Sequence, residues 1–212
     1  LLLLLFFSLS SYSQTLNLNN TFIEKNLRIS QLNGDIDESI SFTIRPLHIN
    51  NYDIKSFNIE NYAPTVFSFL NKKGKFKILP LDYNITFNSH HPYNRNNGSM
   101  IPSRGYQQLI SMGVYFELGP LSIQLKPEHI YAENKDYEGF WEGHDDVIWN
   151  RRYQLWNRID IPEKFGESSY EKTTIGQSSI RLNYKNLSIG LSSENIWWGP
   201  SIRNGVMMSN NA

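Results

Sequence analysis

Three features are missing from this 212-residue sequence, and each absence excludes a class of protein. The absence of cysteine excludes disulfide bonds, thiolate metal sites and a cysteine nucleophile. The 20 Lys and Arg residues balance the 20 Asp and Glu residues without forming a basic stripe, so nucleic-acid binding is not expected. No run of about 20 apolar residues is present, as a membrane-spanning helix would need. A membrane β-barrel needs no such run, because polar lumen-facing residues alternate with apolar ones.

The N-terminus has the pattern of an export signal. Residues 1–7 form an unbroken apolar run, LLLLLFF, and mostly small or polar residues follow as far as Ser13. This order is typical of the apolar core and cleavage region of a secretory signal peptide, with cleavage expected between Ser13 and Gln14. No initiator Met or basic segment precedes the run. We therefore expect residues 1–13 to be a signal peptide that is truncated at its start.

Residues 14–74 carry weaker patterns. Ile23, Leu27 and Leu32 are spaced loosely as on a helix, which Gly34 would end. Residues 39–47, SISFTIRPL, alternate apolar and polar side chains up to a proline, which predicts a short strand at a sheet edge. We expect a helical or irregular N-terminal segment with one short strand.

From residue 75 to residue 212 the sequence predicts antiparallel strands. Apolar and polar side chains alternate within residues 81–88, 110–118, 121–126, 180–184 and 187–192, which gives each strand one apolar and one polar face. Tight turns at Gly119-Pro120 and Lys185-Asn186 alternate with long loops at residues 90–104 and 134–173. This all-β pattern fits a membrane β-barrel with short turns at one end and long loops at the other. It equally fits a soluble β-sandwich.

The longer loop is predicted to contain a short helix. Asp145 or Asp146 can cap its N-terminus, and Pro162 excludes its continuation. Trp149, Tyr153 and Trp156 then occupy positions i, i+4 and i+7 and share one helix face. Such a long, aromatic loop is typically functional.

Catalytic and metal-binding residue types show no recognised motif. The candidate groups are His90-His91, Glu128-His129 and His144-Asp145-Asp146, none of which has the spacing of a known metal site. We predict no catalytic residue, no metal and no cofactor. Glu138 and Glu142 flank Trp141 and could mimic the two carboxylates of a glycosidase. The alternative is that both are solvated loop charges.

The tryptophans give a stronger indication of function. A Trp side chain offers a flat apolar face on which a sugar ring can stack, and Arg side chains can bind sugar hydroxyls. The sequence therefore predicts a polysaccharide-binding surface formed by Trp141, Trp149, Arg151, Arg152, Trp156, Trp197, Trp198 and Arg203. Two alternatives remain open for these tryptophans, which are loop packing and the aromatic girdle of a membrane barrel.

Several blocks of the sequence, taken together and in order, resemble the Wzi-type capsule-assembly proteins in the version common in Bacteroidetes. The blocks are SISFTIRPL (residues 39–47), NRIDIPEKFG (residues 157–166), GQSS (residues 176–179), SENIWWGP (residues 193–200) and MSNNA (residues 208–212). The WWGP and SNNA blocks are the most specific. The resemblance covers most of the mature chain.

This resemblance implies a large transmembrane β-barrel in the outer membrane, with a small periplasmic helical element near the N-terminus. The present chain would be the N-terminal part of that barrel. The implied role is non-enzymatic and lectin-like: the protein binds exported capsular polysaccharide or exopolysaccharide and helps to assemble it at the cell surface. The implied partners are the polysaccharide, outer-membrane lipid and the export machinery. The alternatives are a passive porin and a secreted soluble β-sheet enzyme that acts on glycans.

Overall fold

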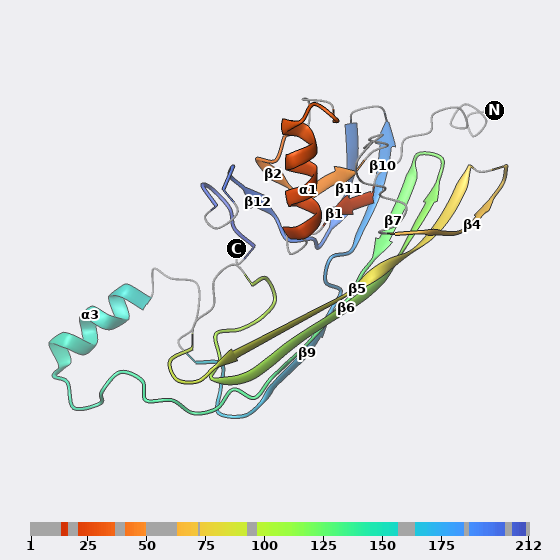
Figure 1. The fold of residues 1–212 in the computed structure, drawn as a ribbon. Helices are drawn as coiled ribbons and strands as arrows, with labels where there is room; N and C mark the ends of the chain where they lie inside the picture. Colours follow the sequence, from red (N-terminus) through yellow and green to blue (C-terminus); the bar gives the residue numbers. More distant parts are fainter. Residues whose placement is uncertain are drawn as a thin grey trace.

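The computed structural model describes residues 14–16, 21–36, 41–49, 63–71, 73–92, 97–156, 164–184, 187–201 and 205–210. The predicted signal peptide and the candidate residue Arg203 lie outside these ranges. No helix within the ranges is long and apolar enough to cross a membrane. Most of the regular structure is antiparallel β-sheet, as the alternating pattern predicts (Figure 1).

One large antiparallel sheet organises the chain (Figure 1). β6 pairs with both β7 and β8, while β10 pairs with β7 and β9 pairs with β8. β7 and β8 thus continue one another along β6, and β10 and β9 do the same in the next position. The sheet is a meander with β4 and β11 at its edges. The strands are β4 (Thr65–Phe69), β5 (Gly74–Asn88), β6 (Gly105–Leu118), β7 (Leu121–Leu125), β8 (Glu128–Ala132), β9 (Tyr170–Thr174), β10 (Ser179–Tyr184) and β11 (Leu187–Ser192).

The two ends of this sheet differ in the length of their connections, as predicted. Gly119 and Pro120 join β6 to β7, and β10 and β11 form a hairpin in which Tyr184 pairs with Leu187. Gly119 has a φ of +55°, which glycine adopts readily in tight turns. The opposite end carries residues 89–104 between β5 and β6, and residues 133–169 between β8 and β9. We call these the short-turn end and the long-loop end.

The remaining elements form a small N-terminal lobe. It consists of α1 (Thr21–Leu32), β1 (Gln14–Leu16), β2 (Ile44–Arg45), β3 (Leu47–Ile49) and β12 (Trp197–Trp198). β1 pairs with β3, and β2 pairs with β12. Figure 1 shows α1, β1, β2 and β12 grouped beside β10 and β11. The lobe therefore joins the start of the chain to the segment that follows the last strand of the large sheet.

The lobe confirms one prediction and corrects another. α1 forms where the helical spacing predicts it, with Ile23 and Leu27 buried and with Gly34 after the helix at a φ of +75°. Leu32, the third residue of the predicted spacing, does not join the buried face, since it is 87% exposed at the end of the helix.

The strand predicted over residues 39–47 forms only in part, as β2, because residues 41–43 are not in a strand and a separate strand, β3, begins at Leu47. Pro46 separates β2 from β3, and it has no backbone N–H to contribute to a continuous ladder. Residues 39 and 40 of the predicted strand lie outside the described residues.

The large sheet exposes its apolar face and buries its polar face. On β6, Gln107, Ser111 and Glu117 are 1%, 2% and 3% exposed, whereas Ile110 and Met112 on the other face are 37% and 60% exposed. A soluble β-sandwich buries its apolar faces against each other. The distribution of side chains in this sheet is therefore the opposite of what the sandwich alternative requires.

Candidate functional site

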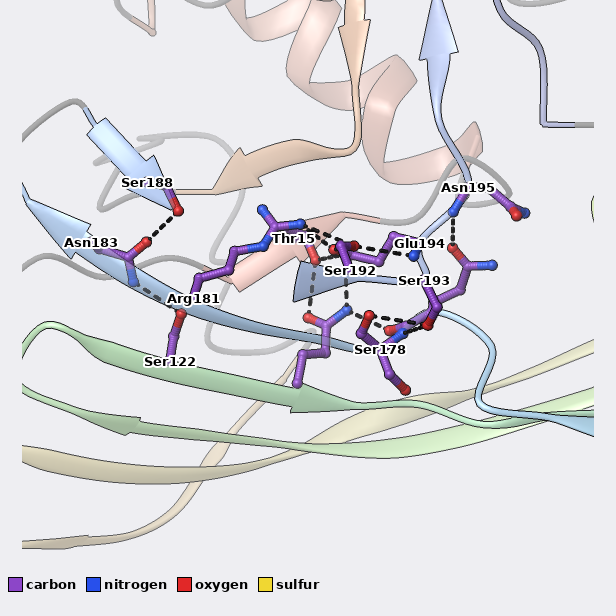
Figure 2. Close-up of polar contacts among 12 residues, drawn as sticks. Thr15, Ser122, Ser178, Arg181, Asn183, Ser188, Ser192, Ser193, Glu194 and Asn195 are labelled. Atoms are coloured by element: carbon purple, nitrogen blue, oxygen red, sulfur yellow. Dashed lines mark hydrogen bonds and ion pairs between the residues drawn. The ribbon is translucent and has the colours of Figure 1, made fainter. Parts of the chain in front are cut away.

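The polar face of the sheet is held together by a buried carboxylate, Glu194, just after β11. Its Oε2 accepts hydrogen bonds from the Arg181 guanidinium and from Ser192 Oγ, the latter at 2.8 Å. Its Oε1 lies beside the Thr15 hydroxyl and 3.3 Å from Gln124 Nε2. Figure 2 shows Thr15 of β1 and Arg181 of β10 directed at Glu194. Because Thr15 belongs to β1, this network fastens the N-terminal lobe to the polar face of the sheet.

A second carboxylate, Glu128 at the start of β8, holds part of the loop between β5 and β6. It accepts hydrogen bonds from Ser99 Oγ and from Gln177 Nε2, the latter at 2.8 Å. Gln177 Oε1 in turn accepts the backbone N–H of Asn195 at 2.9 Å. A Cβ on Gly98 would lie 2.7 Å from the side-chain nitrogen of Asn195, Nδ2, so glycine allows this close approach. Ser99 is thus hydrogen-bonded to β8, and Gly98 lies beside the Asn195 side chain.

Two largely buried cations of the polar face, Lys126 and Arg181, have opposite charges beside them. Lys126 Nζ lies 2.5 Å from Asp82, and the Arg181 guanidinium contacts Glu194. Charges removed from water require such partners, since an isolated buried ion is very costly.

The sequence singled out Glu128 only as part of the candidate group Glu128-His129, and it indicated no individual role for Gln177 or Glu194. These two residues lie within the GQSS and SENIWWGP blocks, which set them apart in the sequence.

Trp197 and Trp198 belong to the N-terminal lobe and not to the long-loop end. β12 pairs with β2, and Trp197 is 2% exposed, with the Arg45 guanidinium 5.9 Å from its ring centre. Its Nε1 donates a hydrogen bond to the Gly199 carbonyl at 3.1 Å. Trp198 is 41% exposed. The Trp197 ring has no face open for a sugar, so its geometry corresponds to the packing alternative.

Arg45 links this tryptophan to the helix of the lobe. Its Nε and Nη2 atoms lie 3.0 Å and 2.5 Å from the two carboxylate oxygens of Glu24 on α1. Both side chains are almost entirely buried. Trp197 of the WWGP block therefore packs against Arg45, which pairs with Glu24. These contacts give the block a structural role in the lobe.

The loop tryptophans lie elsewhere, on and beside α3 (Asp146–Trp156), which extends away from the sheet (Figure 1). The helix begins as predicted, since Asp145 Oδ1 accepts the backbone N–H of Ile148 at 2.9 Å. Trp149 and Tyr153 stack with ring centres 5.6 Å apart, which confirms that they share a helix face. The side chain of Trp156, the third predicted member of this face, lies outside the described residues.

Residues before the helix complete this arrangement, which we call the loop aromatic cluster. The Phe140 and Trp149 rings are nearly perpendicular with their centres 5.0 Å apart, and the Arg152 guanidinium lies 4.1 Å from the Phe140 ring centre. His144 contacts the Phe140 and Trp141 rings at 4.4 Å and 5.1 Å. The cluster consists of Phe140, Trp141, His144, Trp149, Arg152 and Tyr153.

The loop aromatic cluster is open to solvent. Trp141 and Tyr153 are 67% and 59% exposed, and Arg151 on α3 is exposed as well. Large aromatic rings are rarely left in water unless they contact a partner, because their burial is strongly favourable. The structure thus brings Trp141, Trp149 and Arg152 together, with Arg151 on the same helix, and separates them from Trp197 and Trp198.

The base of this long connection is fixed by Asn134, which is buried. Its Nδ2 lies 2.9–3.3 Å from the carbonyl oxygens of Phe165, Gly166 and Ser168. Nearby, Lys164 Nζ lies 2.5 Å from Asp136. Their hydrogen bond holds the pKa of the Asp136 carboxyl below its usual range and that of the Lys164 ammonium above it. These contacts join the two ends of the connection and position the cluster between them.

Replacing Asn134 by alanine is expected to loosen this connection. The substitution removes the donor that three carbonyl groups share. The lost and unsatisfied hydrogen bonds should lower the free energy of unfolding by about 1–3 kcal/mol. Limited proteolysis should then cleave residues 133–169 faster than in the parent protein. Asn150→Ala, at an exposed position of α3, is the matched control and should leave the rate unchanged. Equal cleavage of the parent and Asn134→Ala proteins would show that Asn134 does not fix the connection.

The described residues contain no group of three or more His, Asp or Glu side chains that could hold a metal ion. Glu138 and Glu142, the alternative glycosidase pair, are both exposed on the loop. Comparisons of the chain with protein-family models, curated proteins and solved structures gave no match. Functional inference therefore depends on the geometry of the sheet and of the loop aromatic cluster.

Proposed function

We propose that this chain forms part of an outer-membrane β-barrel of the Wzi type, which binds exported polysaccharide at the cell surface without cleaving it. The exposed apolar face of the large sheet carries the membrane part of the proposal. The exposed loop aromatic cluster supports the polysaccharide part. The resemblance of the SISFTIRPL, SENIWWGP and MSNNA blocks to the Wzi-type family supports both.

The outward side chains of β6 match the thickness of a bilayer. Ile110, Met112, Val114, Phe116 and Leu118 alternate on this face and span nine residues. A tilted barrel strand needs about 9–11 residues to cross the hydrocarbon core. Beyond Ile110, toward the long-loop end, the same face continues with Gln108 and Tyr106. The lipid-facing band would therefore lie toward the short-turn end, and the surplus of β5 and β6 would project outward.

Aromatic side chains lie at both limits of this band. At the short-turn end, Phe67 stacks on Phe76 at 5.0 Å, and Phe69 stacks on Phe116 at 5.7 Å. At the other limit, the hydroxyls of Tyr83 and Tyr106 are 3.1 Å apart. Two aromatic girdles that flank an apolar band are characteristic of membrane barrels.

The polar face supports a binding role in preference to that of an open porin. The contacts of Thr15 with Gln124 and Glu194 place the N-terminal lobe on the face that would line the lumen. A lobe in this position would obstruct solute flow. Planar-bilayer recordings test this part of the proposal. Low conductance is expected, and a large, stable conductance would favour the porin.

The sugar-binding part is tested by Trp141→Ala. Trp141 presents the largest exposed ring of the loop aromatic cluster, and aromatic residues at the centre of binding sites often contribute 2 kcal/mol or more, which is roughly 30-fold in affinity. We expect cells with this variant to retain at least tenfold less polysaccharide at their surface. Binding to purified polysaccharide should weaken by a similar factor.

Trp198→Ala is the matched control, because it removes an exposed tryptophan that lies in the N-terminal lobe. It should leave retention unchanged. Heat-modifiable gel mobility of the outer-membrane fraction shows whether each variant is inserted. Full retention by inserted Trp141→Ala protein would refute the role of the cluster. Release of reducing ends from the polysaccharide would instead favour an enzyme.

A further inference from the structure

The connection that bears the loop aromatic cluster is acidic, although the chain as a whole is neutral. Residues 133–169 contain nine Asp and Glu residues but five Lys and Arg residues. The connection thus has a formal charge of −4, and because the whole chain has a formal charge of zero, the remaining residues have +4. Trp141 lies within this acidic connection.

Several of the basic side chains in the connection are already engaged. Lys135 lies 2.8 Å from Glu133, and Lys164 lies 2.5 Å from Asp136. The Arg152 guanidinium lies over the Phe140 ring inside the cluster. Of the described basic residues in this connection, Arg151 is the one for which the structure gives no such partner. Among these described residues, few positive charges therefore remain available for an anionic ligand.

The acidic side chains around Trp141 are less engaged. Glu138 and Glu142 are exposed, and neither takes part in an ion pair in the described part of the chain. Asp145 and Asp146 are also exposed, at the start of α3, where Asp145 caps the helix. Carboxylates close to a binding surface repel anions over about one Debye length, ~8 Å at physiological ionic strength.

We infer that the polysaccharide bound by the loop aromatic cluster carries no carboxylate, sulfate or phosphate groups. This inference depends on the proposed function and narrows its ligand to a class of glycan. An uncharged sugar ring can stack on Trp141 and share its hydroxyls with Glu138 and Glu142, since carboxylates accept such hydrogen bonds strongly. A polymer with regular negative charges would bring each charge close to these carboxylates, and like charges in contact select against a ligand.

The test uses the full chain, purified in detergent, on an array of neutral and acidic bacterial polysaccharides. The neutral polymer that binds best is then oxidised at its primary hydroxyls, so that the same backbone carries carboxylates. We expect the oxidised polymer to bind about tenfold more weakly at low salt, and the difference to shrink as salt screens the repulsion.

A charge-neutral double variant makes this test specific to the cluster. Glu138→Gln combined with Glu142→Gln keeps the size and polarity of both side chains and removes two charges. Interactions between exposed charges are weak, so this variant should recover roughly two- to tenfold of the affinity for the oxidised polymer, and at most the whole of the tenfold loss. Glu167→Gln removes one charge from the same connection outside the cluster and should recover little.

The possible outcomes separate this inference from the proposed function. Preference for the neutral polymer, with partial recovery in the double variant, supports the inference. Equal or tighter binding of acidic polymers overturns it and leaves polysaccharide binding intact. A difference that the double variant does not change also overturns it, because the repulsion would then lie elsewhere. Absence of binding to every polymer refutes the proposed function and the inference with it.

Discussion

Met112→Arg is expected to prevent stable insertion of the protein into a bilayer, while hardly affecting a soluble sheet. Met112 lies on the exposed apolar face at the middle of β6 and is 60% exposed. In water, a charged side chain at such a position changes stability by about 0.5 kcal/mol or less. Met112 lies between the edge of the apolar band at Ile110 and its centre at Val114. Arg on the lipid face of a barrel costs about 2–4 kcal/mol at the midplane and less toward the interfaces. The size of the loss in stability therefore distinguishes a face exposed to water from a face in contact with lipid.

The matched control for this substitution is Gln108→Arg. Gln108 lies four residues away on the same strand and the same face, beyond the apolar band. Near the membrane interface the cost of Arg falls to about 0–1 kcal/mol. Folding of the full chain into lipid vesicles, followed by urea titration and gel mobility, measures both variants. Equal behaviour of Met112→Arg and Gln108→Arg would indicate that this face does not contact lipid.

The strands that the sequence predicts well are those whose two faces differ in polarity. Residues 110–118 alternate between Ile, Met, Val, Phe or Leu and residues that are mostly polar, and β6 contains all of them. Such a pattern is local, so it can be detected without knowledge of the partner strands. The environment of the two faces could not be predicted in this way, because alternation is the same whichever face is buried. The structure distinguishes them by exposure.

The missed strands lack this contrast. β8 and β9 place His129, Tyr131, Glu171 and Thr173 on the outward face, where the other strands have aliphatic residues. β4 is interrupted by a register shift between Thr65 and Phe67, which breaks the period of two. β4 and β8 form because the longer strands β5 and β6 provide hydrogen-bond partners, and β9 pairs in turn with β8. This is a tertiary effect that local patterns do not contain.

The candidate site was predicted only in part, for a similar reason. The α3 helix, its cap and the Trp149–Tyr153 pair depend on residues within one turn or two, so spacing predicts them. The position of Trp197 depends on β2, whose Arg45 lies far away in the sequence. The tryptophans thus have different environments: Trp197 is buried in the lobe, whereas Trp141 is exposed on the loop.

Among the single substitutions proposed, Glu194→Ala is expected to lower the free energy of unfolding the most. The Glu194 side chain is 1% exposed, and its partner Arg181 is 10% exposed. Removal of one member of a buried ion pair costs about 3–5 kcal/mol, because the other charge loses its compensation while remaining buried. Thr15 and Gln124 lose an acceptor at the same time. The N-terminal lobe should therefore detach from the sheet as stability falls.

A double-mutant cycle separates the ion pair from general disruption of the network. Arg181→Met alone should also destabilise, since it leaves the Glu194 carboxylate buried without its guanidinium. The double variant should lose less than the sum of the two single losses, because neither charge then remains uncompensated. Glu171→Ala, at a largely exposed carboxylate, is the control and should cost about 0.5 kcal/mol or less. Additive losses in urea titrations of the full chain would show that Arg181 and Glu194 are not coupled. The lobe would then be fastened to the sheet by contacts other than this pair.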